Sequence, residues 1–189
     1  MNEGINNREI EVRFLGIDVR ETVKKLLLMN AKDLGEELLQ ETIFYDANKK
    51  WLEEKKVVRL RKTPTTQTLT YKHTQKDTPD GTEEIEMNVE DLAKTKAILE
   101  ALGLVAFRQQ EKKRRVFLWD GVQFSIDEHP MVPPYLEIEG PSEQLIKDAA
   151  RAIELDWNDA HFESSRDFIE KIYQIPLTSL KTYTFKKIE

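Results

Sequence analysis

The stretch Glu9-Ile10-Glu11-Val12-Arg13 shows the pattern that decides how this chain folds, because charged and apolar residues alternate along it. Successive side chains of an extended strand point to opposite faces, so the charged residues here share one face and the apolar residues the other. The tripeptide Glu-Ile-Glu returns at Glu84-Ile85-Glu86 and at Glu137-Ile138-Glu139. Composition alone gives on the order of 0.2 occurrences of it. The sequence therefore predicts three strands, each with two carboxylates on one face.

The bulk composition narrows the function classes. The 189 residues suit one domain, 1–189, with a polar tail at 1–7 and a helical segment at 141–189 that packs on the rest. There is no cysteine, which excludes a disulfide framework, a thiolate metal site and a cysteine nucleophile. A formal net charge of -6 argues against general nucleic-acid binding. Neither a membrane-spanning run nor a signal peptide is recognisable, so we expect a cytoplasmic, prokaryotic protein with no membrane association.

Turn and capping signals divide the chain into about eight strands and four helices. We expect strands at 8–15, 42–46, 57–62, 68–73, 84–89, 108–118, 122–127 and 135–140. Helices are expected after Asp18, with an apolar stripe that includes Leu26 and Leu27, and after Asp91, after Ser142 and from Ser165. The dipeptide Asp120-Gly121 favours a tight hairpin. This order predicts an α+β fold built mainly from antiparallel hairpins.

Charged residues recur at alternate positions on most of these strands, which leaves two interpretations. The ordinary one is a sheet with a buried apolar face and a solvated charged face. The other is a closed antiparallel eight-stranded β-barrel whose apolar face is covered by the helices outside, so that the charged face lines a tunnel. Buried charge is costly unless each group has a partner. Carboxylates favour divalent cations and basic groups favour anionic oxygens, so a polyphosphate with Mg²⁺ or Mn²⁺ would satisfy both.

An ordered series of short motifs favours the interpretation as a barrel with a charged tunnel. These motifs are Glu9-Ile10-Glu11-Val12-Arg13, Tyr45-Asp46, Arg59-Leu60-Arg61, Leu69-Thr70-Tyr71-Lys72, Glu84-Ile85-Glu86, Lys112-Lys113-Arg114, Asp127 and Glu137-Ile138-Glu139. In this order they resemble the CYTH domain of the triphosphate tunnel metalloenzymes. That family includes class IV adenylyl cyclases, thiamine triphosphatases and inorganic triphosphatases. The resemblance covers most of the chain and implies an eight-stranded tunnel that binds a triphosphate with divalent metal.

The resemblance also implies roles for individual residues. The catalytic residues would be Glu9, Glu11, Arg13 and Lys72. The substrate-binding residues would be Arg59, Arg61, Lys72, Lys112 and Arg114. The ligands of Mg²⁺ or Mn²⁺ would be Glu9, Glu11, Glu86, Asp127, Glu137 and Glu139. Arg13 stands where the family's opening motif has lysine, and an arginine does not act as a general base at ordinary pH.

Three functions remain open. The first is a metal-dependent phosphohydrolase that acts on inorganic, nucleoside or thiamine triphosphate. The second is a class IV-type adenylyl cyclase that makes cyclic AMP and pyrophosphate, and the third is a non-catalytic nucleotide or polyphosphate sensor. The chain has no Gly-rich phosphate loop, which excludes a Walker-type NTPase. The histidines His73, His129 and His161 are expected in surface or loop positions, and the protein is expected to be a monomer or homodimer.

Overall fold

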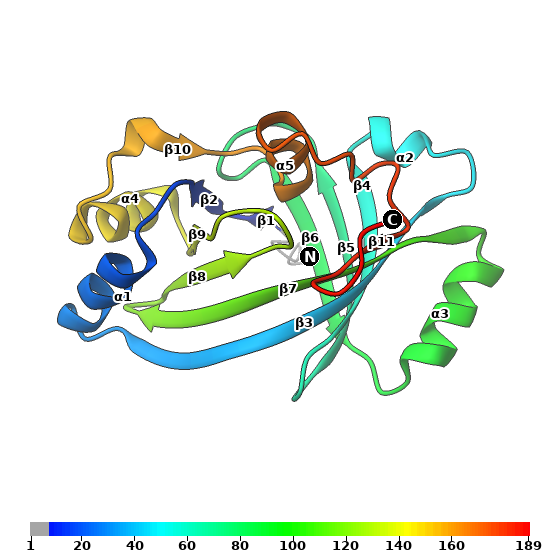
Figure 1. Ribbon diagram of the computed structural model, residues 1–189, viewed down its shortest axis with the longest axis horizontal. Coiled ribbons are helices and arrows are strands. Elements are labelled where there is room, and N and C mark those ends of the chain that lie inside the picture. The colour runs from blue at the N-terminus through cyan, green and yellow to red at the C-terminus, as the bar shows by residue number, and fades with distance from the viewer. Residues whose placement is uncertain (1–7) are drawn as a thin grey trace, which may run out of the picture.

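The structure is a computed structural model that describes residues 8–189, apart from the side chain of Glu9. The predicted tail at 1–7 lies outside the described residues. A strongly curled sheet forms the body of the protein, and helices lie on its outer side (Figure 1). The strands are β1 (Arg8–Glu9), β2 (Glu11–Phe14), β3 (Lys32–Asp46), β4 (Lys56–Lys62), β5 (Gln67–Thr74), β6 (Thr82–Asn88), β7 (Leu104–Trp119), β8 (Val122–Glu128), β9 (Tyr135–Glu139), β10 (Ala160–His161) and β11 (Thr182–Tyr183). The helices are α1 (Val19–Leu28), α2 (Lys50–Glu53), α3 (Leu92–Ala101), α4 (Glu143–Ala152) and α5 (Ser165–Ile172), with a 3₁₀ turn at Trp157–Asp159.

The strand order explains how the sheet curls. Hydrogen bonds connect the strands in the order β1-β6-β5-β4-β3-β7-β8-β9-β2-β10, and β11 adds to β7 in parallel. The neighbours along the main path are antiparallel, which confirms the predicted α+β fold with an antiparallel sheet. β1 stands at one end of this order and β2 near the other, yet only Ile10 separates them in the chain. The hydrogen-bonded path itself is open, so a closed eight-stranded barrel stays a prediction.

The predicted elements form, with differences that have local causes. β3 begins at Lys32 rather than at residue 42, because the pattern of its first half is broken at a bulge. There Gly35 adopts a φ of +88°, which favours glycine, and its N–H donates to Asp33 Oδ1 at 2.9 Å. The short helix α2 and the strands β10 and β11 were not predicted. Leu27 does not join the buried stripe of α1, because it is half exposed beside the fully buried Leu26.

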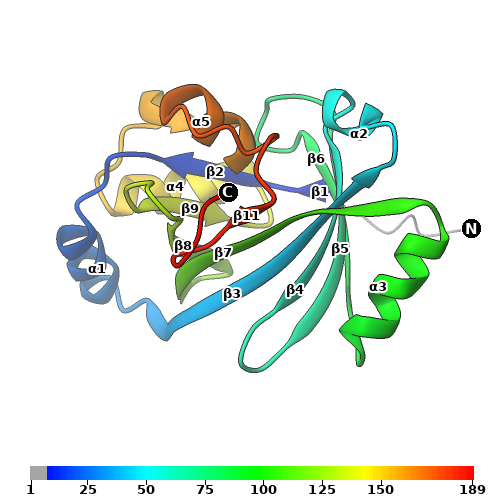
Figure 2. The same cartoon turned by 45° about the vertical axis from the view of Figure 1, so that its right-hand side comes forward.

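The apolar core lies outside the curl. Leu26 of α1 and Ile146 of α4 pack against the outer face of β2, β7, β8 and β9, where Phe117 and Phe124 are fully buried. At the opposite end α3 places Leu99 against β3 and β4, and Figure 2 shows this helix far from α1 and α4. Because side chains alternate along each strand, covering one face with helices turns the charged face toward the inside of the curl. None of the helices described is both long and apolar enough to cross a lipid bilayer.

Candidate functional site

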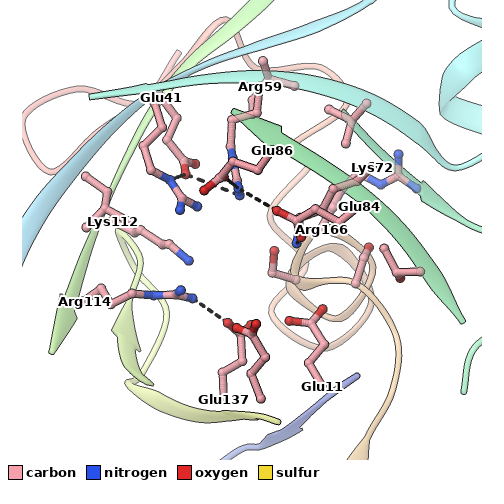
Figure 3. Close-up of a pocket in the computed structure, with 18 of the residues that line it drawn as sticks. Glu11, Glu41, Arg59, Lys72, Glu84, Glu86, Lys112, Arg114, Glu137 and Arg166 are labelled. Carbon is pink, nitrogen blue, oxygen red and sulfur yellow. Dashed lines mark hydrogen bonds and ion pairs between the residues drawn. The ribbon is translucent and has the colours of Figure 1, made fainter. Parts of the chain in front are cut away.

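The inside of the curl is a cavity of about 1020 Å³ lined mainly by charged side chains. Residues from β2 to β7 and from β9 contribute to it, and the first turn of α5 adds Arg166. Figure 3 shows carboxylates and basic groups from different strands turned toward the same central space. The second interpretation of the alternating pattern, an ionised interior, is therefore the one that describes this sheet.

One side of the cavity, here called the tight wall, is formed by β2, β7, β8 and β9 and is held by short ion pairs. Asp127 accepts hydrogen bonds from Arg114 at 2.6 and 2.7 Å and from Lys112 Nζ at 2.6 Å. Arg114 also reaches Glu137 at 2.5 Å, and Glu137 contacts Arg13 at 2.9 Å. Arg13 in turn bonds Glu11 and donates to the backbone oxygen of Glu163. This chain of contacts links four strands through side chains alone.

Burial and pairing shift the pKa values of the tight wall in opposite ways. Burial would raise the pKa of Glu137, but Arg114 and Arg13 outweigh it and hold that pKa well below its usual range. Burial lowers the pKa of Lys112 to about 8, and the neighbouring Arg114 contributes to this. For Arg13, burial acts to lower the pKa, while Glu11 and Glu137 raise it above its ordinary value. Pairing thus favours the charged forms of Arg13, Glu137 and Asp127, whereas burial disfavours the charged form of Lys112.

The opposite side, here called the loose wall, is formed by β3, β4, β5 and β6. Glu41 is almost fully buried and accepts hydrogen bonds from Arg61 Nε at 2.8 Å and from Gln110 Nε2 at 2.6 Å. Burial would raise the pKa of Glu41, but Arg61 and Arg59 lower it well below its usual range. Lys72 contacts Glu84 at 2.5 Å. The basic groups of this wall therefore also stand beside carboxylates.

Arg59 of the loose wall stands among several carboxylates. Its guanidinium lies 3.5 Å from Glu86, 3.7 Å from Glu41 and 3.8 Å from Glu84, and it donates to Thr70 Oγ1 at 3.2 Å. Figure 3 shows it among these carboxylates at the edge of the central space. Each of these ion pairs is individually weaker than a close, aligned hydrogen bond.

Two carboxylates meet directly across a strand pair. Glu11 of β2 stands opposite Glu139 of β9 in the antiparallel register, and both side chains line the cavity. Like charges directly opposite each other repel, and this repulsion favours a cation between or beside them. Among the described residues, however, no group of three or more histidine, aspartate or glutamate side chains is arranged to hold a metal ion by itself.

The structure brings most of the predicted site residues to one place. The cavity is lined by Glu11, Arg13, Arg59, Arg61, Lys72, Glu86, Lys112, Arg114, Glu137 and Glu139. Asp127 is different, because it is fully buried behind the surface of the cavity and binds two of the basic residues from there. Glu9 lies on β1, but its side chain is outside the described part of the structure.

Sequence reasoning missed other members of the site. Glu41 could have been found from the hairpin register, since it stands opposite Arg61, but the inward positions of β3 mix charged and apolar residues and hide the pattern. Arg108, Arg166 and His129 also line the cavity, and no local signal marks them. His129 was expected in a surface or loop position: it lies in the loop that follows β8, but it is buried rather than at the surface, being only 4% exposed.

The fold and the cavity together define an α+β protein with an ionised chamber inside a curled antiparallel sheet. The chain belongs to the CYTH family: the family model described as CYTH domain matches residues 7–173. Among curated protein sequences, none matches the chain closely enough to show a relationship.

Solved structures share this architecture. The PH1012 protein of Pyrococcus horikoshii OT3 is 23% identical with a TM-score of 0.71, and the match covers 84% of this chain and 98% of that one. An adenylate cyclase candidate from Vibrio parahaemolyticus is 12% identical with a TM-score of 0.75, covering 87% and 98%. The adenylyl cyclase candidate HpAC1 from Hippeastrum, described as having a dominant triphosphatase activity, is 13% identical with a TM-score of 0.62, covering 86% and 94%. At these identities the similarity shows the fold alone.

Proposed function

We propose that this protein is a divalent-metal-dependent phosphohydrolase that acts on a triphosphate compound bound inside the curled sheet. The observation that carries the proposal is the convergence of Arg59, Arg61 and Lys72 from one wall, and Lys112 and Arg114 from the other, on a single cavity. Five basic groups around one space provide the donors that the oxygens of a triphosphate require. Membership of the CYTH family, and the triphosphatase activity ascribed to HpAC1, support this reaction class.

The carboxylates fit a Mg²⁺ or Mn²⁺ ion that shares its coordination with the substrate. Mg²⁺ is usually held by one or two carboxylates together with phosphate oxygens rather than by an all-protein cage. The opposed pair Glu11 and Glu139 supplies two hard oxygen donors, which agrees with the absence of a three-residue cluster among the described residues. Glu9, Glu86, Asp127 and Glu137 stay predicted ligands. When bound, the ion would neutralise phosphate charge and polarise the group under attack.

The chain's own residues would act mainly by positioning. In phosphoryl transfer, alignment of the attacking water and neutralisation of the phosphate oxygens supply most of the catalysis. Arg13 is paired with Glu11 and Glu137. We therefore propose that Arg13 holds the side chain of Glu11 in position and does not transfer a proton. Lys72 lies beside Glu84 and would exchange this partner for a phosphate oxygen. We further propose that the curl closes between β1 and β2 into the eight-stranded tunnel that the sequence predicts.

The test is release of phosphate from tripolyphosphate, ATP and thiamine triphosphate with Mg²⁺ and with Mn²⁺. We expect turnover of at least one of them that EDTA abolishes. The variant Glu11→Gln should raise the metal concentration needed for the half-maximal rate, because it removes one charged ligand from the opposed pair. If no compound of the panel is turned over with either metal, the hydrolase proposal is wrong.

The same panel decides between the alternatives. Formation of cyclic AMP and pyrophosphate from ATP would identify a class IV-type adenylyl cyclase, an activity suggested by the names of two structural neighbours. A rise in melting temperature with tripolyphosphate or ATP, together with no product of any kind, would identify a non-catalytic sensor.

A further inference from the structure

The imidazole of His129 is a buried polar group in the wall of the cavity. Among the described residues it makes no hydrogen bond. Its ring is 4% exposed, it lines the cavity, and neither ring nitrogen has a partner among the described residues. Buried polar side chains are nearly always hydrogen-bonded, because an unmade bond leaves the desolvation of that group uncompensated. His161, which is partly exposed, does have a partner, since its Nδ1 lies 3.1 Å from a carboxylate oxygen of Glu163.

Two tyrosines hold the ring in one orientation. Tyr135 stacks on one side with ring centroids 6.0 Å apart and planes 3° apart, and Tyr183 stacks at 6.0 Å and 17°. Both tyrosines are anchored, because Tyr183 donates to the backbone oxygen of Pro130 at 2.6 Å and Tyr135 donates to Asp127 at 3.3 Å. Offset stacking of this kind fixes the plane of an aromatic ring. The nitrogens lie in that plane, so a hydrogen bond from the ring is directed close to it.

The ring stands among charged groups, because Lys112, Asp127, Glu41 and Arg114 are close enough to influence it, and burial disfavours a charge on the ring itself. A neutral imidazole always carries one N–H, and it adds a hydrogen-bond donor without adding another buried charge. Lys112 and Arg114 line the same cavity, so an anion attracted by them arrives near this donor.

We propose that His129 donates a hydrogen bond from its ring to a non-bridging oxygen of the bound phosphate chain, as a further binding residue beside Lys112. This inference rests on the proposed function, because it needs a phosphate chain in the cavity. It accounts for an observation that the ion pairs of the two walls do not explain, namely a rigidly held polar ring without a protein partner. In this role His129 orients the phosphate chain and does not exchange a proton with it.

The experiment measures the affinity for tripolyphosphate by calorimetry in EDTA, where no metal-dependent hydrolysis can occur. His129→Phe keeps a stacking ring and removes the donor, so we expect binding to weaken about tenfold or more. His129→Gln restores an N–H donor and should bind within about threefold of the natural protein. His161→Gln is the matched control, because His161 is not among the residues that line the cavity, and its affinity should be unchanged.

Stability gives a second readout that separates binding from packing. Replacing a buried, unpartnered polar ring by an apolar ring of similar shape should leave the melting temperature of His129→Phe unchanged or raise it. A merely structural histidine would instead give a lower melting temperature and unchanged affinity among the folded molecules. The chain has three histidines, so ¹⁵N spectra of the imidazoles can also report directly whether the His129 signal shifts when tripolyphosphate is added.

The outcomes separate this inference from the function on which it rests. If the natural protein neither binds nor hydrolyses any triphosphate of the panel, both fail. If the natural protein binds tripolyphosphate and His129→Phe binds it equally well, only the role of His129 is overturned. If His129→Phe does not fold, the comparison of His129→Gln with the natural protein and the ¹⁵N shift decide: an unchanged His129 signal on binding overturns the inference.

Discussion

The two walls of the cavity carry similar charges but hold them differently. In the tight wall Asp127 is completely covered, Glu137 is 7% exposed, and their contacts with basic groups are 2.5 to 2.9 Å long. In the loose wall Arg59 keeps its carboxylate neighbours at 3.5 to 3.8 Å, and the side chain of Glu86 is 40% exposed. The loose wall also holds short ion pairs, Lys72–Glu84 at 2.5 Å and Arg61–Glu41 at 2.8 Å, so the contrast between the walls concerns the surroundings of Arg59 and Glu86.

The outer faces show the same contrast. Behind the tight wall, α1 and α4 cover the sheet with a large apolar cluster. Behind the loose wall, α3 covers β3 and β4 with a smaller apolar cluster, while Ile85 and Met87 of β6 are about half exposed. A sheet that is packed on its outer face and cross-linked on its inner face moves little, because close-packed interiors resist deformation. We therefore interpret the tight wall as a preorganised scaffold and the loose wall as the side that adjusts when a ligand enters.

The largest expected effect is a loss of stability when the tight wall loses its central carboxylate. Asp127→Asn removes the charge that Lys112 and Arg114 share, and leaving buried cations without compensation costs about 3–5 kcal/mol. Urea unfolding monitored by circular dichroism measures the change, provided that the m-value stays constant.

The matched variant on the loose wall is Glu86→Gln, which also replaces a carboxylate by an amide of the same shape. Glu86 is 40% exposed and 3.5 Å from Arg59, so we expect a change in unfolding free energy within about 1 kcal/mol. Equal losses in the two variants would contradict the contrast between the walls.

A smaller effect, on binding rather than stability, is expected from the loose wall. Arg59→Ala removes a guanidinium that lines the cavity, and we expect the KM for the triphosphate to rise about 10- to 100-fold. Arg59→Lys keeps the positive charge but lacks the planar guanidinium, so its KM should lie between those of the natural protein and Arg59→Ala. An unchanged KM in Arg59→Ala would remove this residue from the binding site.

The smallest effect is a pH dependence that comes from the tight wall. The pKa of Lys112 is lowered to about 8, so the free protein loses this positive charge as the pH rises through that value. Affinity for tripolyphosphate should fall above about pH 8, by up to about tenfold per pH unit. Because the folded pKa lies below the ordinary 10.5, the unfolded chain binds more protons between these values, and stability from this group rises with pH there.

Calorimetric titrations from pH 6.5 to 9.5 measure the effect on affinity. Lys112→Arg supplies a cation that stays protonated, so the affinity of this variant for tripolyphosphate should not change with pH over the same range. If the affinity of the natural protein for tripolyphosphate is equally constant from about pH 6.5 to 9.5, Lys112 does not lose its proton in this pH range.

Strands and their faces were predictable from local sequence. The period-two alternation around Glu11, Arg59, Arg61, Glu137 and Glu139 places these residues on one face of their strands, and the structure turns that face inward. The tight turn at Asp120-Gly121 was also predicted from the sequence. In the structure both residues have the positive φ that a two-residue hairpin turn requires. Its closure pairs Trp119 with Val122 and sets the register in which Arg114 meets Asp127.

Other features of the site depend on contacts between distant segments. Arg166 reaches the cavity because α5 packs against Tyr135 through Phe168, and these residues are more than 30 positions apart. The burial of His129 depends on Tyr183, which β11 brings alongside β7. No periodicity around either residue could have shown this, because the partners come from elsewhere in the chain.

The sequence by itself determined that this chain forms amphipathic strands with ionised faces, since the geometry of an extended backbone assigns each residue to a face. Only the tertiary structure decided which of those charges neutralise one another and which can accept new partners. The reason is distance: electrostatic coupling falls off over a few ångströms, and whether Asp127 or Glu86 lies within reach of a cation depends on how the strands pair and curl.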